Sequence, residues 1–423
     1  MTSKNKIDRA GYALSKKDFR SEDEEIEAEI VFDDYRREHL QPLTDTTYLI
    51  QDWLSNFGKH YYIAQRLKRR PQILRKMRRF SVRLTQLQDI GGNRVIVDTN
   101  ADVEALRHFL QGRIASTSEL RLHRETDYRT VGRDDTGYRA LHLILEKAGV
   151  KIELQLRSRA QHYWAEAIER TSVIYGFHLK ENEGDPKVLD YFKLLSQVFF
   201  ELEAKRDPTP QKKITLDEQR ELAERVIEKS SRGQFLHSYA DDGVLKTLAE
   251  YERGRADSIS NWILIFDWNT GRFVSWDSIS HNPIEAYQSY SDAEKMYGEP
   301  GGFEVVLIGS SNVSMIRRTH SHYFGIEGYD SILESLEESV VGFTGRRPLS
   351  TEARRVLHAL LRKKFWGHNT VSHDTLANHY CKSVQDIDRA LKELTDIGLI
   401  EIDNKQHGIS LQSSKKAEIE SYL

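Results

Sequence analysis

Short runs typical of β-strands alternate with helical stretches through the first half of this chain. The pattern predicts helices at residues 22–38, about 46–68, 160–175 and 187–205, and strands at 93–98, 120–125, 138–145 and 150–156. Strands mixed with helices require a sheet on which the helices pack. We therefore expect an α+β fold in this half of the chain.

A chain of 423 residues is too long for one ordinary domain. The helix-breaking stretch Asp207-Pro208-Thr209-Pro210 predicts the first boundary. We expect three domains, at residues 1–206, 207–345 and 346–423. The second is expected to be a small regulatory α+β domain, with helices at 217–229, 244–253 and 284–296 and strands at 262–267, 272–276 and 303–308. Its first two strands flank Trp268-Asn269-Thr270-Gly271, which is typical of a hairpin.

The third segment has helical patterns at 350–365, 373–380 and 383–397, followed by a strand pair, and this order resembles a winged helix. Its last helix carries Asp386, Asp388, Glu393 and Asp396 against Arg389 and Lys392. A helix that enters the major groove of DNA normally brings an excess of cations. We therefore expect this domain to contact protein rather than DNA.

Two histidine patterns have ordinary structural explanations. His373-Asp374 spells the dipeptide of metal phosphohydrolases, but its other ligands are missing and the position suits a helix N-cap. His320 and His322, beside Tyr323, suit the exposed end of a strand better than a metal site.

The overall charge excludes a globally basic surface for binding nucleic acid, because the chain has 62 basic and 65 acidic residues. Cys381 is the single cysteine, so neither an intrachain disulfide nor a cysteine-based metal cluster is expected. The first residues lack a signal peptide's apolar stretch, and no run approaches the roughly 20 apolar residues that a bilayer requires. We expect a soluble, cytoplasmic protein without a membrane partner.

The strongest local signal is the basic run Arg66–Arg79, with eight cations in fourteen residues and no acid. It precedes Asp89 in the turn Asp89-Ile90-Gly91-Gly92, which leads into a strand. Clustered cations before a carboxylate at a strand edge suit a polyphosphate substrate with a divalent metal.

Two further segments place polar groups on strand faces. The two-residue period of a strand puts Glu153, Gln155 and Arg157 on one face of 151–157. The same period puts Tyr138 and His142 on one face of the preceding strand. An aromatic ring beside cationic groups is suited to stacking on a nucleobase.

From Arg66 to Tyr175 the sequence resembles the synthetase domain of RelA/SpoT-type alarmone synthetases. Four stretches match in order: Arg66-Leu67-Lys68 with Ile73 and Lys76; Asp89–Arg94; Gly137–His142; and Glu153–Ser158 followed by Trp164-Ala165-Glu166 and Glu169. The resemblance implies a mixed β-sheet with flanking helices, related to nucleotidyltransferases. It implies transfer of the β,γ-pyrophosphate of ATP to the 3′-hydroxyl of GDP or GTP, giving the alarmone (p)ppGpp of stringent-response signalling.

The resemblance also implies roles for individual residues. Asp89 and Glu153 would bind Mg²⁺, and Glu153 is also a candidate base for the attacking hydroxyl. Tyr138 would stack on the acceptor base. Arg94 and Arg157 would be catalytic, by neutralising charge on the phosphates in transit. The remaining residues implied to bind nucleotide are Arg66, Lys68 and Lys76 on the ATP side, and His142 and Gln155.

The sequence departs from the family on the acceptor side. Asp134, after Arg133, stands where the family often has Lys, Glu169-Arg170 replaces a Glu-His pair, and Gly176 replaces a Lys. These departures and the basic run Arg66–Arg79 keep open an alternative, a toxin-type member that pyrophosphorylates the 3′ end of tRNA. No metal phosphohydrolase domain precedes the match, so a protein that only synthesises alarmone is expected.

A third alternative is a regulatory protein without catalysis that acts through the winged helix. Retention of both Asp89 and Glu153 argues against that reading. We further expect the C-terminal half to regulate the enzyme in cis, its acidic helix docking near Arg66–Arg79 until a signal or protein partner releases it. A truncation at about Asp207 would then be more active than the full chain.

Overall fold

The computed structural model describes residues 2–133, 136–233, 260–270, 272–279, 282–297, 302–310, 350–381, 384, 386–403, 408–416 and 419. The helix expected at 244–253, the cluster His320, His322 and Tyr323, and Asp134 all lie outside these residues. The described chain forms two compact units, Met1–Leu336 and Glu337–Leu423.

One eight-stranded sheet organises the described part of the first unit, in the order β3-β4-β5-β2-β1-β8-β6-β7. The strands β2 and β5 are parallel, and the other neighbours are antiparallel. The fold is therefore α+β with a mixed sheet, as expected. The strands are β1 Tyr61–Leu67, β2 Gly91–Val97, β3 Arg121–Asp127, β4 Leu141–Lys147, β5 Val150–Ser158, β6 Ser260–Asp267, β7 Arg272–Ile279 and β8 Phe303–Ser310.

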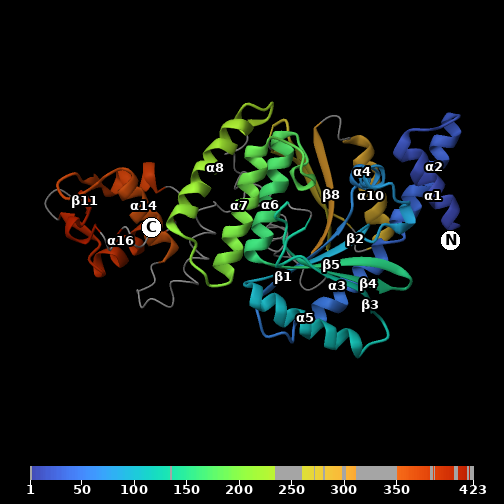
Figure 1. Cartoon of the computed structure of the whole chain (residues 1–423), viewed down its shortest axis with the longest axis horizontal. Coiled ribbons are helices and arrows are strands. Elements are labelled where there is room, and N and C mark those ends of the chain that lie inside the picture. Colours follow the sequence, from blue (N-terminus) through green and yellow to red (C-terminus); the bar gives the residue numbers. More distant parts are fainter. Residues whose placement is uncertain are drawn as a thin grey trace. The chain divides into compact units, whose positions relative to one another are not determined.

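Helices cover both faces of this sheet (Figure 1). Helices α3 and α5 cover one face, where Leu106 and Leu110 meet Leu154 and Leu156 in a buried apolar cluster. Helix α6 lies over the opposite face, followed by α7 and α8. The helices of this unit are α1 Lys4–Lys16, α2 Glu22–Arg37, α3 Leu40–Leu54, α4 Arg70–Phe80, α5 Asn100–Ala115, α6 Arg159–Tyr175, α7 Pro186–Glu203, α8 Pro210–Glu228 and α10 Pro283–Met296.

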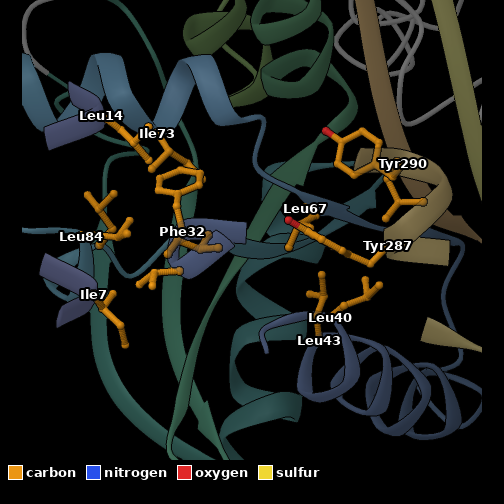
Figure 2. Packing of buried hydrophobic residues seen from close by; sticks show 14 of the residues in the cluster. Ile7, Leu14, Phe32, Leu40, Leu43, Leu67, Ile73, Leu84, Tyr287 and Tyr290 are labelled. Atoms are coloured by element: carbon orange, nitrogen blue, oxygen red, sulfur yellow. The ribbon is translucent and has the colours of Figure 1, made fainter. Parts of the chain in front are cut away.

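A second apolar cluster joins the N-terminal helices to the described part of residues 207–345, called here the central segment. Figure 2 shows Phe32 of α2 and Leu67 of β1 packed in the same cluster as Tyr287 and Tyr290 of α10. Residues more than two hundred positions apart thus share one core. Burying such side chains stabilises each by roughly 1.5–3 kcal/mol.

The central segment therefore differs from the separate small domain expected at 207–345. Its strand β8 pairs with β1, with Gln65 opposite Gly309 and Arg66 opposite Ile308. The hairpin expected around Trp268–Gly271 does form, from β6 and β7, but it extends the first sheet. The expected boundary at 206 fails because the backbone hydrogen-bonding groups on the free side of β1 are paired by β8 rather than by water.

Two stretches of the first unit differ from the secondary structure predicted for them. The single helix expected at 46–68 is wrong, because α3 ends at Leu54 and β1 begins at Tyr61. Gly58, in the turn between them, has φ +72°, a left-handed conformation that favours glycine. Helix α5 was not expected, although Thr99 and Asp102 form a capping box at its start.

The described part of the C-terminal unit contains helices and a small sheet in the order β10-β11-β9. Its elements are α14 Thr351–Arg362, β9 Val371–Ser372, α15 His373–Thr375, a π-helical turn Leu376–Tyr380, α16 Ile387–Asp396, β10 Ile400–Asp403 and β11 Gly408–Leu411. The Ser372 side chain accepts a hydrogen bond from the Thr375 backbone, so the N-cap expected beside His373 is present. The winged-helix interpretation of this order stays a prediction.

Across the described helices, none combines the length and the apolar character that a membrane crossing needs.

Candidate active site

Polar side chains gather on the sheet face that α6 covers. The parallel register of β2 and β5 sets Gly92 beside Glu153 and Arg94 beside Gln155, and β4 brings His142 opposite Gln155. Side chains of directly paired residues project to the same face. Three neighbouring strands therefore deliver their polar groups to one place, while their apolar residues face α3 and α5.

Five of these side chains form a closed hydrogen-bonded ring. His142 Nδ1 lies 2.9 Å from Glu153 Oε1, and His142 Nε2 lies 2.7 Å from Tyr138 Oη. Arg157 Nη2 donates to Tyr138 Oη at 2.9 Å and to Gln155 Oε1 at 2.6 Å. Gln155 Nε2 donates to Glu153 Oε2 at 2.6 Å, which completes the circuit. Each member of the ring is held by two others, so the position of Glu153 is well defined.

The ring controls the protonation of its members. Burial alone would raise the pKa of Glu153, but the charge of His142 and its hydrogen bond lower it to about 2. Burial likewise opposes the charged form of His142, yet Tyr138 and Glu153 raise its pKa to about 9. Glu153 is therefore an anion at neutral pH, and His142 carries the compensating positive charge.

Asp89 forms the second carboxylate of the site. Its Oδ2 accepts hydrogen bonds from Lys68 Nζ at 2.5 Å and from Lys76 Nζ at 2.7 Å. Burial alone would raise its pKa, but the two ammonium groups lower it well below the usual range. The other oxygen, Oδ1, is buried and has no hydrogen-bond partner among the described residues. A buried anionic oxygen without a donor is costly, which suits a position that a ligand completes.

Arginines link the strands to α6. Arg94 Nη1 donates to Glu166 Oε1 at 2.9 Å, and the Glu166 side chain is completely buried. Arg66 Nη1 lies 3.8 Å from Glu169 Oε1, and Arg66 Nη2 donates to Gln72 at 3.1 Å. Within α6, the matching stretch Trp164–Glu169 thus supplies carboxylates that hold the strand arginines. The resemblance implied no role for Glu166, and the structure shows that it holds Arg94.

The basic run is already paired within the first unit. Arg70 forms an ion pair with Glu29, Arg75 forms ion pairs with Glu181 and Glu183, and Arg79 forms one with Glu181. The Arg78 guanidinium donates to the Ser15 carbonyl, and Arg69 meets Glu304. Together with Arg66, Lys68 and Lys76, every cation of the run has a partner. The surface expected to receive an acidic helix is therefore largely neutralised.

Tyr138 is positioned by the turn before it. Gly137 has φ +87°, and an added Cβ would meet Ser196 Cβ of α7 at 3.0 Å, so glycine is required there. Only 7% of Tyr138 is exposed. Its ring meets His142 and Trp164 edge-on, and the Arg157 guanidinium lies 5.2 Å from its centroid. The expected contact with a nucleobase therefore needs this packing to open.

Of the predicted site residues, the structure brings Glu153, Gln155, Arg157, Tyr138 and His142 into one ring and joins Asp89 to Lys68 and Lys76. The charge of Asp89 acts to raise the pKa of Glu153, against the stronger lowering effect of His142. Among the described residues no cluster of three or more His, Cys, Asp or Glu could hold a metal by itself.

Residues 65–177 match the family model described as the region found in RelA / SpoT proteins. The chain carries a RelA/SpoT domain. This domain spans β1 to the end of α6 and includes all of the predicted site residues. Gly176, one of the departures of the RelA/SpoT domain from the family pattern, ends α6 with φ +83° and so has a structural role as its C-cap.

Several solved structures resemble part of the chain. Small alarmone synthetase 2 from Bacillus subtilis is 22% identical over 42% of this chain and 93% of its own, with a TM-score of 0.33. Small alarmone synthetase 1 from the same organism, solved with its product pppGpp, is 20% identical over 45% and 93%, with a TM-score of 0.31. A GTP pyrophosphokinase family protein from Streptococcus pneumoniae is 20% identical over 44% and 95%, with a TM-score of 0.33.

No curated protein matches the chain in sequence at a significant level.

Proposed function

We propose that this chain is an ATP-dependent pyrophosphokinase that transfers the β,γ-pyrophosphate of ATP to the 3′-hydroxyl of GDP or GTP. The hydroxyl oxygen attacks the β-phosphorus, the bond from that phosphorus to the oxygen of the α-phosphate breaks, and AMP leaves. The hydroxyl proton passes to a base or to solvent. The product is (p)ppGpp.

The observation that carries this proposal is the pairing of two buried anionic carboxylates with cations in the RelA/SpoT domain. Asp89 lies between Lys68 and Lys76, and Glu153 lies in the ring that contains His142 and Arg157. Phosphoryl and pyrophosphoryl transfer depends mainly on positioning and on neutralising phosphate charge. Cations fixed in this way supply both.

A divalent cation such as Mg²⁺ fits the chemistry of this donor set. Mg²⁺ prefers carboxylate oxygens and usually binds one or two of them together with substrate phosphates. Asp89, with its unpartnered Oδ1, and Glu153 would hold it. When bound, the ion would neutralise charge on the triphosphate.

The protonation of Glu153 favours the metal-binding role over the role of base. A general base works best when its pKa lies near the operating pH. The pKa of Glu153 is lowered to about 2, so the carboxylate has little tendency to take up a proton at neutral pH. We therefore propose that Glu153 acts as an anionic ligand rather than as the base.

The alternative acceptor, the 3′ end of tRNA, depended partly on the basic run. Arg75 and Arg79 are paired with Glu181, and Arg70 is paired with Glu29. Tight binding of a nucleic acid backbone needs cations that exchange small counterions for phosphates. This pairing favours a free nucleotide as the acceptor.

One experiment separates the candidates. The full chain is incubated with Mg²⁺ and ATP labelled at the γ-phosphate, and GDP, GTP and tRNA are offered separately. We expect label in a guanosine nucleotide and release of AMP. Label only in tRNA would establish the toxin-type activity instead, and no transfer by folded protein would favour the non-catalytic alternative.

A further inference from the structure

A buried arginine outside the RelA/SpoT domain bonds directly to the backbone of Lys68. Arg36 lies near the end of α2 and is 1% exposed. Its Nε donates to the Lys68 carbonyl oxygen at 2.9 Å. Arg36 lies 32 positions before Lys68 in the chain.

The Nη1 and Nη2 groups of Arg36 donate to the central segment. Arg36 Nη1 donates to Glu294 Oε2 of α10 at 2.5 Å, and Nη2 donates to Glu294 Oε1 at 3.1 Å. Nη2 also donates to Tyr290 Oη at 2.9 Å. The two-point contact with a carboxylate fixes the plane of the guanidinium. Helix α10 therefore determines where the Nε donor points.

The residue after Lys68 is held from the same segment. Arg69 Nη1 lies 3.0 Å from Glu304 Oε1 of β8, and both side chains are buried. Trp268 Nε1 donates to the second oxygen of Glu304 at 2.7 Å, which orients the carboxylate. Strand β8 also pairs directly with β1, opposite Arg66.

The Lys68 backbone is thus held on two sides. Its amide donates to the Ile90 carbonyl at 2.8 Å, next to Asp89, and its carbonyl accepts from Arg36. The Lys68 ammonium group then reaches Asp89 Oδ2. A long lysine side chain gains a defined position only when its backbone is fixed, since its rotamer freedom is large.

We propose that α10 and β8 position Lys68 for the ATP phosphates through the positioning residues Arg36 and Arg69. The inference rests on the proposed function, because the ATP role of Lys68 belongs to that function. It makes the central segment a structural part of the synthetase site. The segment then acts on ATP binding through contacts at the end of β1.

The test removes the charge pair without leaving one charge buried. The variant Arg36→Met with Glu294→Gln deletes both charges, which folded proteins tolerate far better than deletion of one partner. A second variant, Arg36→Lys, keeps a cation beside Glu294 but removes the planar fork that reaches both Glu294 and Lys68. Circular dichroism and thermal melting of the full chain establish that each variant is folded.

Two readouts are taken on every folded variant. One is the affinity for a non-hydrolysable ATP analogue with Mg²⁺, measured by calorimetry. The other is the rate at which a trace amine-reactive reagent labels Lys68, measured by peptide mass spectrometry, with the exposed Lys187 of α7 as the internal standard. The matched control is Tyr287→Phe, which removes the hydrogen bond from α10 to Asp33 of α2 and leaves the bonds from Arg36 to Glu294 and Lys68 in place.

We expect analogue affinity to fall roughly tenfold or more, as for loss of a charge-assisted contact. Labelling of Lys68 should rise several-fold, while Tyr287→Phe changes neither readout. Folded variants with Lys68 labelling within twofold of the unaltered chain would overturn the positioning role. If the unaltered chain itself fails to bind the analogue, the proposed function falls, and Lys68 labelling alone still decides whether Arg36 positions this residue.

Discussion

Glu153 and His142 face each other from neighbouring strands, with 2.9 Å between Glu153 Oε1 and His142 Nδ1. This contact keeps the carboxylate anionic and directs its second oxygen toward Gln155. Both carboxylates of the site are kept anionic by cations of the same domain. Removing each carboxylate gives the most direct test of the mechanism.

Asp89→Asn and Glu153→Gln should each lower pyrophosphate transfer by roughly 100-fold or more, because each removes an anion needed to hold a divalent cation against the triphosphate. Turnover is measured at saturating ATP and Mg²⁺, and circular dichroism checks the fold. Glu146→Gln on β4, whose carboxylate pairs with Arg121 near the far end of the strand, is the control. Near-normal turnover of Glu153→Gln would show that the mechanism is wrongly assigned.

Tyr138→Ala should weaken binding of the acceptor by about 5- to 150-fold and leave ATP affinity nearly unchanged, if the Tyr138 side chain stacks on the nucleobase of the acceptor. Tyr138→Phe keeps the ring but removes the hydroxyl that joins His142 to Arg157. We expect this second variant to keep acceptor affinity and to lower turnover. Steady-state constants for ATP and for the acceptor separate the two effects, and equal losses for both substrates would mean that Tyr138 serves only in the core.

Two truncations distinguish the central segment from the C-terminal unit. A chain that ends at Arg206 lacks β8 and α10 and so exposes one side of β1. We expect it to lose ATP affinity, in contrast to the activation expected from the sequence. A chain that ends at Leu336 keeps the first unit. If the C-terminal unit inhibits in cis, this chain should yield more product per mole than the full chain, and equal yields at low and high salt would refute that regulation.

The raised pKa of Glu203, at the end of α7, predicts that the stability of the chain depends on pH. Burial raises its pKa from 4.5 to about 7. The unfolded chain therefore releases this proton first, so the free energy of unfolding falls as pH rises from about 4.5 and levels off above about 7. Glu203→Gln removes the penalty and should stabilise the chain at pH 8 more than at pH 5, by on the order of 1–3 kcal/mol.

Thermal or denaturant unfolding of Glu203→Gln and the unaltered chain at both pH values checks this expectation. Glu201→Gln, which removes a carboxylate from the same helix that pairs with Lys212, is the control. A stabilisation by Glu203→Gln that is the same at pH 5 and pH 8 would contradict the assignment.

Features with a short sequence range were predicted well. The face shared by Glu153, Gln155 and Arg157 followed from the strand period, and the structure confirms it through the contacts among these side chains. The hairpin of β6 and β7 was also predicted correctly, because a turn depends on adjacent residues. By contrast, the turn at Gly58 interrupts the single helix expected at 46–68.

Contacts between distant segments were not accessible from the sequence. The bond from Arg36 to Lys68 and the ion pair of Arg69 with Glu304 join residues from separate elements. Local periodicity does not specify which element packs beside another. The assignment of the central segment to its own domain failed for this reason, since only the pairing of β8 with β1 reveals a shared sheet.

The two ammonium groups on Asp89 Oδ2 have a thermodynamic consequence. A triphosphate that draws Lys68 and Lys76 away would leave the buried carboxylate without countercharge, and a divalent cation alone would leave the two lysines unpaired. When both arrive together, each charge finds a new partner. Their binding should therefore be positively cooperative, and linkage requires that each ligand raise the affinity of the other by the same factor. In this chain, Asp89 would act as the coupling point between nucleotide and metal.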